Sequence, residues 1–262
     1  MHVLMVTIPG RWLDADDPSW AFDVERLVRL LEGQYVDASV ALNLFDADAS
    51  RAAARLGSGE PARDDVQDEF EVELRRREGE IGSDRFWREN FTVRRESVQA
   101  VLKRRWERGE WPDDFERRKE FLHAHSFVFA LDGFLRTLQV LAGTRDAPQN
   151  VVAVATNLRM ALPHLKRVRD SAAHLEDRGR GLGKREQQLD LKPVDNSLFK
   201  APAGVLGLSN LNGSKLGYTT EAGDYGEIDV SVATLSLVRD AFQQVIDAFR
   251  WRGAARTIPH TV

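Results

Sequence analysis

Residues 115–142 constrain the fold most, because apolar residues cover most sides of the helix that they predict. One stripe comprises Phe121, Ala124, Val128, Leu131, Leu135 and Leu138, and a second comprises Phe127, Phe134 and Leu141. Apolar residues that recur every three and four positions indicate an amphipathic helix. A helix that is apolar on most sides lies inside a bundle, where neighbouring helices cover it. We therefore expect a helical bundle around this segment.

A narrow polar face interrupts this central helix. His125, Asp132, Arg136 and Gln139 lie on that face, at spacings of seven, four and three residues. Buried polar groups are costly unless they find partners. We therefore expect His125 and Asp132 to support a site by contacting neighbouring elements.

Three further segments have helical periodicity, and their predicted bounds are 19–56, 149–177 and 233–251. Ser19 is the expected cap of the first helix, since serine accepts hydrogen bonds from the opening N–H groups. Pro163 should kink or divide the second helix. We expect the tail from Gly253 onward to be frayed.

A small β insertion is predicted before the last helix, at about 197–232. Asn212-Gly213 is a strong hairpin signal between the apolar segments 205–208 and 215–219. Residues 227–232 alternate in polarity, as a third strand would. The predicted fold class is therefore mainly α, a helical bundle with a small antiparallel β-hairpin insertion.

We expect residues 1–262 to form a single domain. In this interpretation residues 115–262 are the core, and residues 1–114 are a helical N-terminal extension. Residues 62–120 carry many charges of both signs, which favours exposed helices with i,i+4 ion pairs. That region is predicted to be either a surface for a protein partner or an arm of a dimer.

The charge distribution singles out residues 159–192. This segment carries nine basic and five acidic residues, whereas the whole chain has a net charge of −4. Nucleic acid would be attracted to it; the alternative is a solvated, charged helix end.

The composition and the N-terminal residues bear on location. The chain has no cysteine, which excludes disulfides and thiol chemistry and fits a reducing cytoplasm. Residues 1–9 lack the features of a signal peptide. No apolar run approaches the roughly 20 residues of a membrane span. We therefore expect a cytoplasmic protein without a membrane partner.

Arg169 and His174 are the candidate chemical groups, close to the end of the predicted helix 149–177. Histidine titrates near neutrality, and arginine binds phosphate through two planar donors. On a regular helix, five residues rotate about 140° beyond a full turn, so the two side chains would not share a face. Two arrangements remain open. Either the last turn bends and Arg169 approaches His174, or Arg167 is the phosphate ligand and Arg169 pairs with Asp132.

The spacing of Arg169, Asp170 and His174 resembles the Arg-(four to six residues)-His motif of HEPN domains. This resemblance covers about residues 115–180, and the closing helix loosely. It implies a metal-independent endoribonuclease in which the RNA 2′-hydroxyl is the nucleophile. His174 would be general acid or base, Arg169 would stabilise the phosphate, and Asp170 would orient a partner. Residues 1–114 and the β insertion have no counterpart in a minimal HEPN domain.

The resemblance also implies partners. RNA would be the substrate, two copies would form a homodimer with a shared cleft, and an antitoxin or regulatory protein would control a toxin or defence effector. No metal or other cofactor is expected. The predicted substrate-binding residues are the basic side chains around the helix end, namely Arg167, Arg178, Arg180 and Lys184.

A different class of function remains open beside the ribonuclease. Some HEPN-like proteins are non-catalytic interaction or scaffold proteins. In that case Arg169 would be a buried ion-pair partner of Asp132, and His174 a helix-end cation. His123 and His125 are not expected to bind zinc together, because two residues rotate a helix by about 200°.

Overall fold

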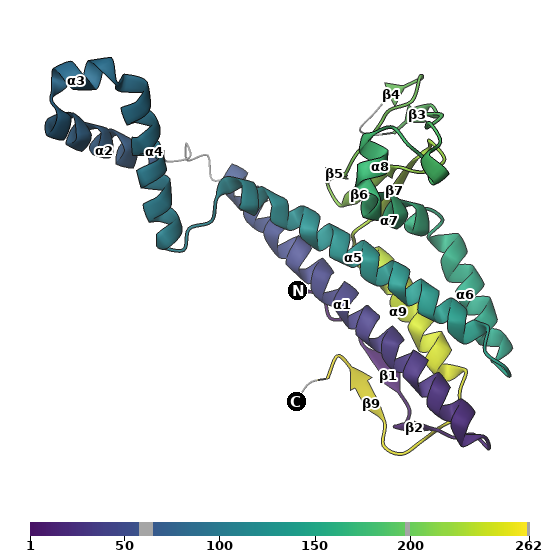
Figure 1. Ribbon diagram of the computed structural model, residues 1–262. Helices are drawn as coiled ribbons and strands as arrows, with labels where there is room; N and C mark the ends of the chain where they lie inside the picture. Colours follow the sequence, from purple (N-terminus) through teal and green to yellow (C-terminus); the bar gives the residue numbers. More distant parts are fainter. Residues whose placement is uncertain (58–64, 197–199, 261–262) are drawn as a thin grey trace. The chain divides into compact units, whose positions relative to one another are not determined.

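The computed structural model describes residues 1–57, 65–196 and 200–260 (Figure 1). The protein is mainly α with a small β insertion, as predicted. Its helices are α1 (Pro18–Gly57), α2 (Asp65–Ile81), α3 (Ser83–Arg88), α4 (Asn90–Glu107), α5 (Asp113–Ala142), α6 (Gln149–Ala161), α7 (Leu165–Ala173), α8 (Leu175–Gly179) and α9 (Val232–Asp247). None of the helices in the described ranges has the length and apolarity needed to cross a membrane.

The strands are short and pair only in antiparallel ladders within the described residues. They are β1 (Val6–Ile8), β2 (Trp12–Leu13), β3 (Val194–Asp195), β4 (Lys200–Ala201), β5 (Asn210–Asn212), β6 (Lys215–Thr219), β7 (Tyr225–Asp229), β8 (Trp251–Arg252) and β9 (Arg256–Ile258). The predicted insertion is the sheet β5-β6-β7 together with the β3–β4 pair. Its expected start near residue 197 lies outside the described residues.

The contacts divide the chain into two compact units. Unit 1 comprises residues 1–47 and 120–262, and unit 2 comprises residues 48–119. Helix α1, which belongs to the predicted N-terminal extension, supplies core residues such as Val24, Leu31 and Leu42 to unit 1. The extension is therefore not separate from the core along its whole length.

Helix α5 has the central position in unit 1 that its two apolar stripes predicted. Phe127, Phe134 and Leu138 are fully buried, and their core cluster includes residues of α1, α6, α7 and α9. In Figure 1 the long helices α1 and α5 run alongside one another. Phe134 also makes an edge-on ring contact with Phe242 of α9, at 5.7 Å between centroids.

Unit 2 is built mainly from α2, α3 and α4 around a much smaller core. Phe70, Leu74, Phe86 and Val93 form this cluster. The predicted exposed helices with ion pairs are present, for example in the pair between Arg85 and Glu89 at 3.0 Å. Unit 2 therefore buries far fewer apolar side chains than unit 1 does.

The predicted helix 149–177 is three helices. The first break follows α6, where Pro163 cannot donate a backbone hydrogen bond, as expected. The second break falls on His174, whose backbone angles of φ −122° and ψ 47° are not helical. His174 therefore joins α7 to α8 rather than lying inside a continuous helix.

Three local predictions were wrong. Asp17 rather than Ser19 caps α1, because its Oδ1 accepts from the N–H groups of Ser19 (2.9 Å) and Trp20 (3.2 Å). Residues 205–208 are not a strand; β5 begins at Asn210 and its hairpin turn contains Gly213. The tail from Gly253 is not frayed over residues 256–258, because β9 pairs there with β1. Backbone pairing with distant strands was not visible in the local sequence.

Candidate functional site

Asp132 lies at the centre of the predicted site, on the polar face of α5. Its side chain is 7% exposed, and its Oδ2 atom lies 2.8 Å from Nε of Arg136 and 2.8 Å from Nε of Arg169. Arg136 follows one turn later on the same helix, whereas Arg169 comes from α7. The polar face of α5 therefore finds its partner on the neighbouring helix, as expected.

Asp170 joins the same charged cluster from α7. Its carboxylate lies 2.8 Å from Nη1 of Arg169 and 3.5 Å from Nζ of Lys166. Arg169 is thus held between two carboxylates, and its side chain is only 14% exposed. This arrangement directs the guanidinium into the protein rather than toward solvent.

The electrostatics of this cluster are dominated by burial. The pKa of Asp132 is raised to about 6, mainly because burial removes the carboxylate from water; Asp170 also raises this pKa, whereas Arg136 and Lys166 lower it. The contacts with arginine are close in distance but poorly directed. Among the described residues, Nε and Nη2 of Arg169 have no hydrogen-bond partner. The contact between Asp132 and Arg169 is therefore a close ion pair without an aligned hydrogen bond.

His174 does not take part in the ion pairs of this cluster. Its side chain is 58% exposed, and Nδ1 lies 3.8 Å from Oε1 of Glu176. No hydrogen bond or ion pair joins it to Arg169 among the described residues. The chain bends at His174, as expected if Arg169 were to approach it. Arg169 nevertheless remains paired with Asp132, as expected in the alternative arrangement.

The predicted phosphate ligands have internal partners of their own. Arg167 pairs with Asp224 in the β6–β7 turn at 3.1 Å. Arg178 is buried, and its guanidinium donates to the carbonyl of Leu182. Arg180 pairs with Asp177 at 2.6 Å and is 59% exposed. Lys184 is exposed in a single 3₁₀ turn, Lys184–Glu186.

His125 contacts the β insertion. Its Nε2 atom forms a hydrogen bond with the hydroxyl of Tyr218 on β6, and the two rings are 5.9 Å apart. Tyr218 is fully buried. This contact ties the sheet to α5 and gives His125 a structural partner.

In one group of the described residues, the possible metal ligands lie close together. The ligand atoms of His174, Glu176 and Asp177 lie within 4.8 Å of one another. His174 and Glu176 are exposed, and Asp177 is already paired with Arg180. The group is therefore a candidate by distance only.

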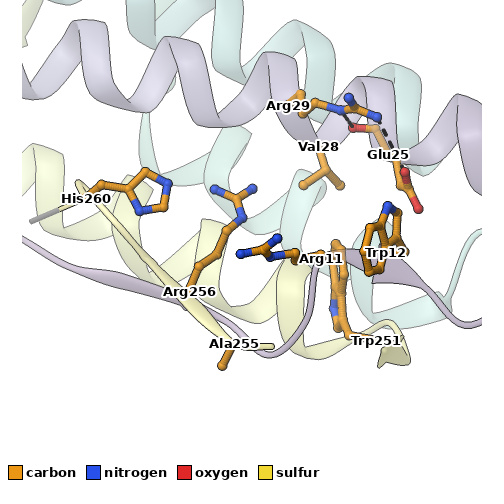
Figure 2. Close-up of a pocket in the computed structure, with 9 residues that line it drawn as sticks. All are labelled: Arg11, Trp12, Glu25, Val28, Arg29, Trp251, Ala255, Arg256 and His260. Carbon is orange, nitrogen blue, oxygen red and sulfur yellow. Dashed lines mark hydrogen bonds and ion pairs between the residues drawn. The ribbon is translucent and has the colours of Figure 1, made fainter. Parts of the chain in front are cut away.

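Sequence reasoning missed a pocket of unit 1 that has a volume of about 470 Å³ (Figure 2). Its basic residues are Arg11, Arg29, Arg256 and His260, and Trp12 and Trp251 are its aromatic residues. These residues come from both ends of the chain and from α1. The local sequence gives no signal for the pocket, because the pairing of the terminal strands brings them together.

Comparison of the chain with family models, with curated proteins and with solved structures finds no match. The contacts of the side chains themselves must therefore support a proposed function.

Proposed function

We propose that this protein is a non-catalytic helical interaction protein, in which Arg169 holds α7 against α5. The observation that carries the proposal is the ion pair between Arg169 and the buried Asp132 at 2.8 Å. A guanidinium that stabilises a phosphate must present its donors to the substrate. Arg169 instead lies between the carboxylates of Asp132 and Asp170, and its side chain is only 14% exposed.

The exposed side chains of unit 2 support an interaction role. Trp87 is 72% exposed and Phe91 is 93% exposed, although both are large and apolar. Aromatic residues are enriched at protein–protein interfaces. The mixed charge of the surrounding helices favours a protein partner over nucleic acid, since it offers no consistently basic surface.

Two alanine variants test the proposal. Arg169→Ala should lower the free energy of unfolding by about 3 kcal/mol, because it leaves Asp132 buried with one cation fewer. His174→Ala should change it by less than about 1 kcal/mol, since exposed charges contribute little. Thermal unfolding of both variants measures the difference. Equal, small effects would contradict a structural role for Arg169.

A metal-independent endoribonuclease is the second candidate function. The break between α7 and α8 favours it, because His174 is exposed there within the basic segment 159–192. In this version RNA is the substrate, a second copy of the chain completes the cleft, and His174 transfers a proton. An antitoxin or other regulatory protein would then control the enzyme.

Incubation with mixed RNA in EDTA separates the two functions. The interaction protein should leave the RNA intact, and His174→Ala should behave in the same way. Cleavage by the wild type that disappears in His174→Ala would overturn our first proposal and establish the ribonuclease. Cleavage that persists in His174→Ala at the same rate would indicate a contaminating nuclease, and a repurified protein should then be inactive.

A further inference from the structure

The pocket of Figure 2 has an excess of positive charge. Three arginines and one histidine line it, against a single lining carboxylate, Glu25. That carboxylate is already engaged, because it accepts from the N–H of Leu13 at 2.8 Å and lies 3.4 Å from Arg29. An anionic ligand would therefore complete the charge balance of the pocket.

Arg11 carries most of the unmatched charge. Arg256 already has a carboxylate partner, since its two terminal nitrogens donate to Glu32 at 2.7 and 2.6 Å. The side chain of Arg11 has no hydrogen bond or ion pair with any other described residue. In Figure 2 its guanidinium projects into the pocket, on the same side as that of Arg256.

The backbone around Arg11 is fixed by the terminal strands. The N–H of Arg11 donates to the carbonyl of Arg252 at 2.9 Å. Gly10 permits this close approach, because a Cβ atom there would lie 2.5 Å from the same carbonyl oxygen. The backbone that carries Arg11 is therefore held in place. This lowers the conformational entropy that would be lost when Arg11 binds a ligand.

Two tryptophans provide an apolar wall beside these cations. The indole N–H of Trp251 donates to the carbonyl of Ile246 at 2.8 Å, which fixes that ring. Trp12 is 52% exposed, and one part of its ring lies against Gly253, where a Cβ atom would come within 3.2 Å. The exposed indole of Trp12 beside Arg11 therefore suits a ligand that has a flat ring next to a negatively charged group.

We propose that this pocket binds a small phosphate monoester that carries a flat ring, such as a nucleoside monophosphate. Arg11 would contact the phosphate, with Arg256 and His260 nearby, and Trp12 would contact the ring. The volume lies within the range of roughly 300–1,000 Å³ that small-molecule pockets have, and it exceeds what a lone inorganic anion needs. This inference is independent of the proposed function, because none of its residues belongs to the Arg169–Asp132 cluster.

Isothermal titration calorimetry with three probes tests the proposal on the full chain. Adenosine 5′-monophosphate should bind, and inorganic phosphate and adenosine should each bind at least about tenfold more weakly, since each makes only part of the contacts. Arg11→Ala should weaken binding of the monophosphate by at least about tenfold. Trp12→Ala should weaken the binding of the monophosphate but leave the binding of inorganic phosphate unchanged.

Arg159→Ala is the matched control, because Arg159 is exposed on α6 and does not line this pocket. It should bind the monophosphate like the wild type. Failure of the monophosphate to bind at millimolar concentration would overturn the proposal, and so would unchanged binding by Arg11→Ala. Equal affinity for inorganic phosphate and the monophosphate would overturn the assignment of a ring to the ligand. The thermal unfolding of each variant shows that its fold is retained.

Discussion

Glu73 in unit 2 and Asp132 in unit 1 are both buried carboxylates that face arginines, yet their pKa values shift in opposite directions. The hydrogen bonds from Arg76, Arg77 and Arg104 lower the pKa of Glu73 to about 2. Burial raises the pKa of Asp132 to about 6, although two guanidinium nitrogens lie 2.8 Å away. Distance to a cation therefore does not decide the charge state of a buried acid.

The difference lies in hydrogen-bond direction and in the neighbouring charges. Both oxygens of Glu73 accept well-aligned N–H groups, at distances of 2.7 to 3.2 Å. Asp132 has close arginines without that alignment, and a second carboxylate, Asp170, lies nearby. Directed hydrogen bonds stabilise a buried charge, whereas unsatisfied neighbours leave its desolvation uncompensated.

The largest effect is expected from Glu73→Gln. It should destabilise unit 2 by about 3 kcal/mol at pH 7, because a pKa shift from 4.5 to about 2 corresponds to that free energy. Hydrogen exchange of the amides of α2 and α4 measures it. Glu80→Gln is the control: Glu80 also pairs with Arg76 but is 57% exposed, so its loss should be under about 1 kcal/mol. Similar exchange in the two variants would contradict the comparison.

Acid should weaken unit 2 through the same carboxylate. Because the folded pKa of Glu73 is depressed, its contribution is present above pH 4.5 and is lost as the pH falls through about 2. About 2 kcal/mol should be lost by pH 3. Amide exchange of α2 and α4, corrected for the intrinsic rate at each pH, measures this loss. Glu73→Gln should respond less to the same change, and an identical acid response would show that other groups control it.

The contribution of Asp132 to stability should change with pH in the opposite direction and by a smaller amount. Its raised folded pKa gives a contribution that is present below pH 3.8 and is lost as the pH rises through about 6. Unit 1 should therefore gain about 1 kcal/mol between pH 7.5 and pH 5 from this residue. Urea unfolding of the wild type and of Asp132→Asn measures it, because the variant lacks that part of the pH response. An identical pH response in the wild type and in Asp132→Asn would contradict the assignment.

The smallest effect is expected for the change in stability that Asp132→Asn causes at pH 7. The change removes two ion pairs but also a costly buried charge, so the free energy of unfolding should move by less than about 1 kcal/mol. Thermal unfolding next to Glu73→Gln gives the direct comparison. A loss as large as the one expected for Glu73→Gln would show that the two sites are equivalent after all.

The helical part of the fold could be predicted because its signals are local. The two apolar stripes of residues 115–142 specify a buried central helix, and Pro163 marks a break that the structure contains. The break at His174 carries no comparable signal, since alanine and histidine are compatible with a continuing helix. Likewise, Asp17 and Ser19 are both good caps, and only the backbone geometry selects between them.

The candidate site could be predicted only in part. The pairing of Asp132 with Arg169 was open to prediction, because both lie on the inward sides of adjacent helices. The partner of His125 could not be predicted, since Tyr218 is 93 residues away in the β insertion. The pocket around Arg11 is the extreme case: its lining residues are adjacent only after β2 has paired with β8.

The pairing of β1 with β9 also has a consequence for the order of folding. Val6 is opposite Ile258, so this ladder closes a loop of about 250 residues, whereas all contacts within unit 2 fall inside residues 48–119. Contacts between distant residues form slowly, because the chain entropy of loop closure must be overcome first. During synthesis, α2, α3 and α4 can associate while α9 and β9 are still untranslated. Unit 1 must wait for its last strand, and a ribosome that stalls before residue 256 would hold the first strand without its partner.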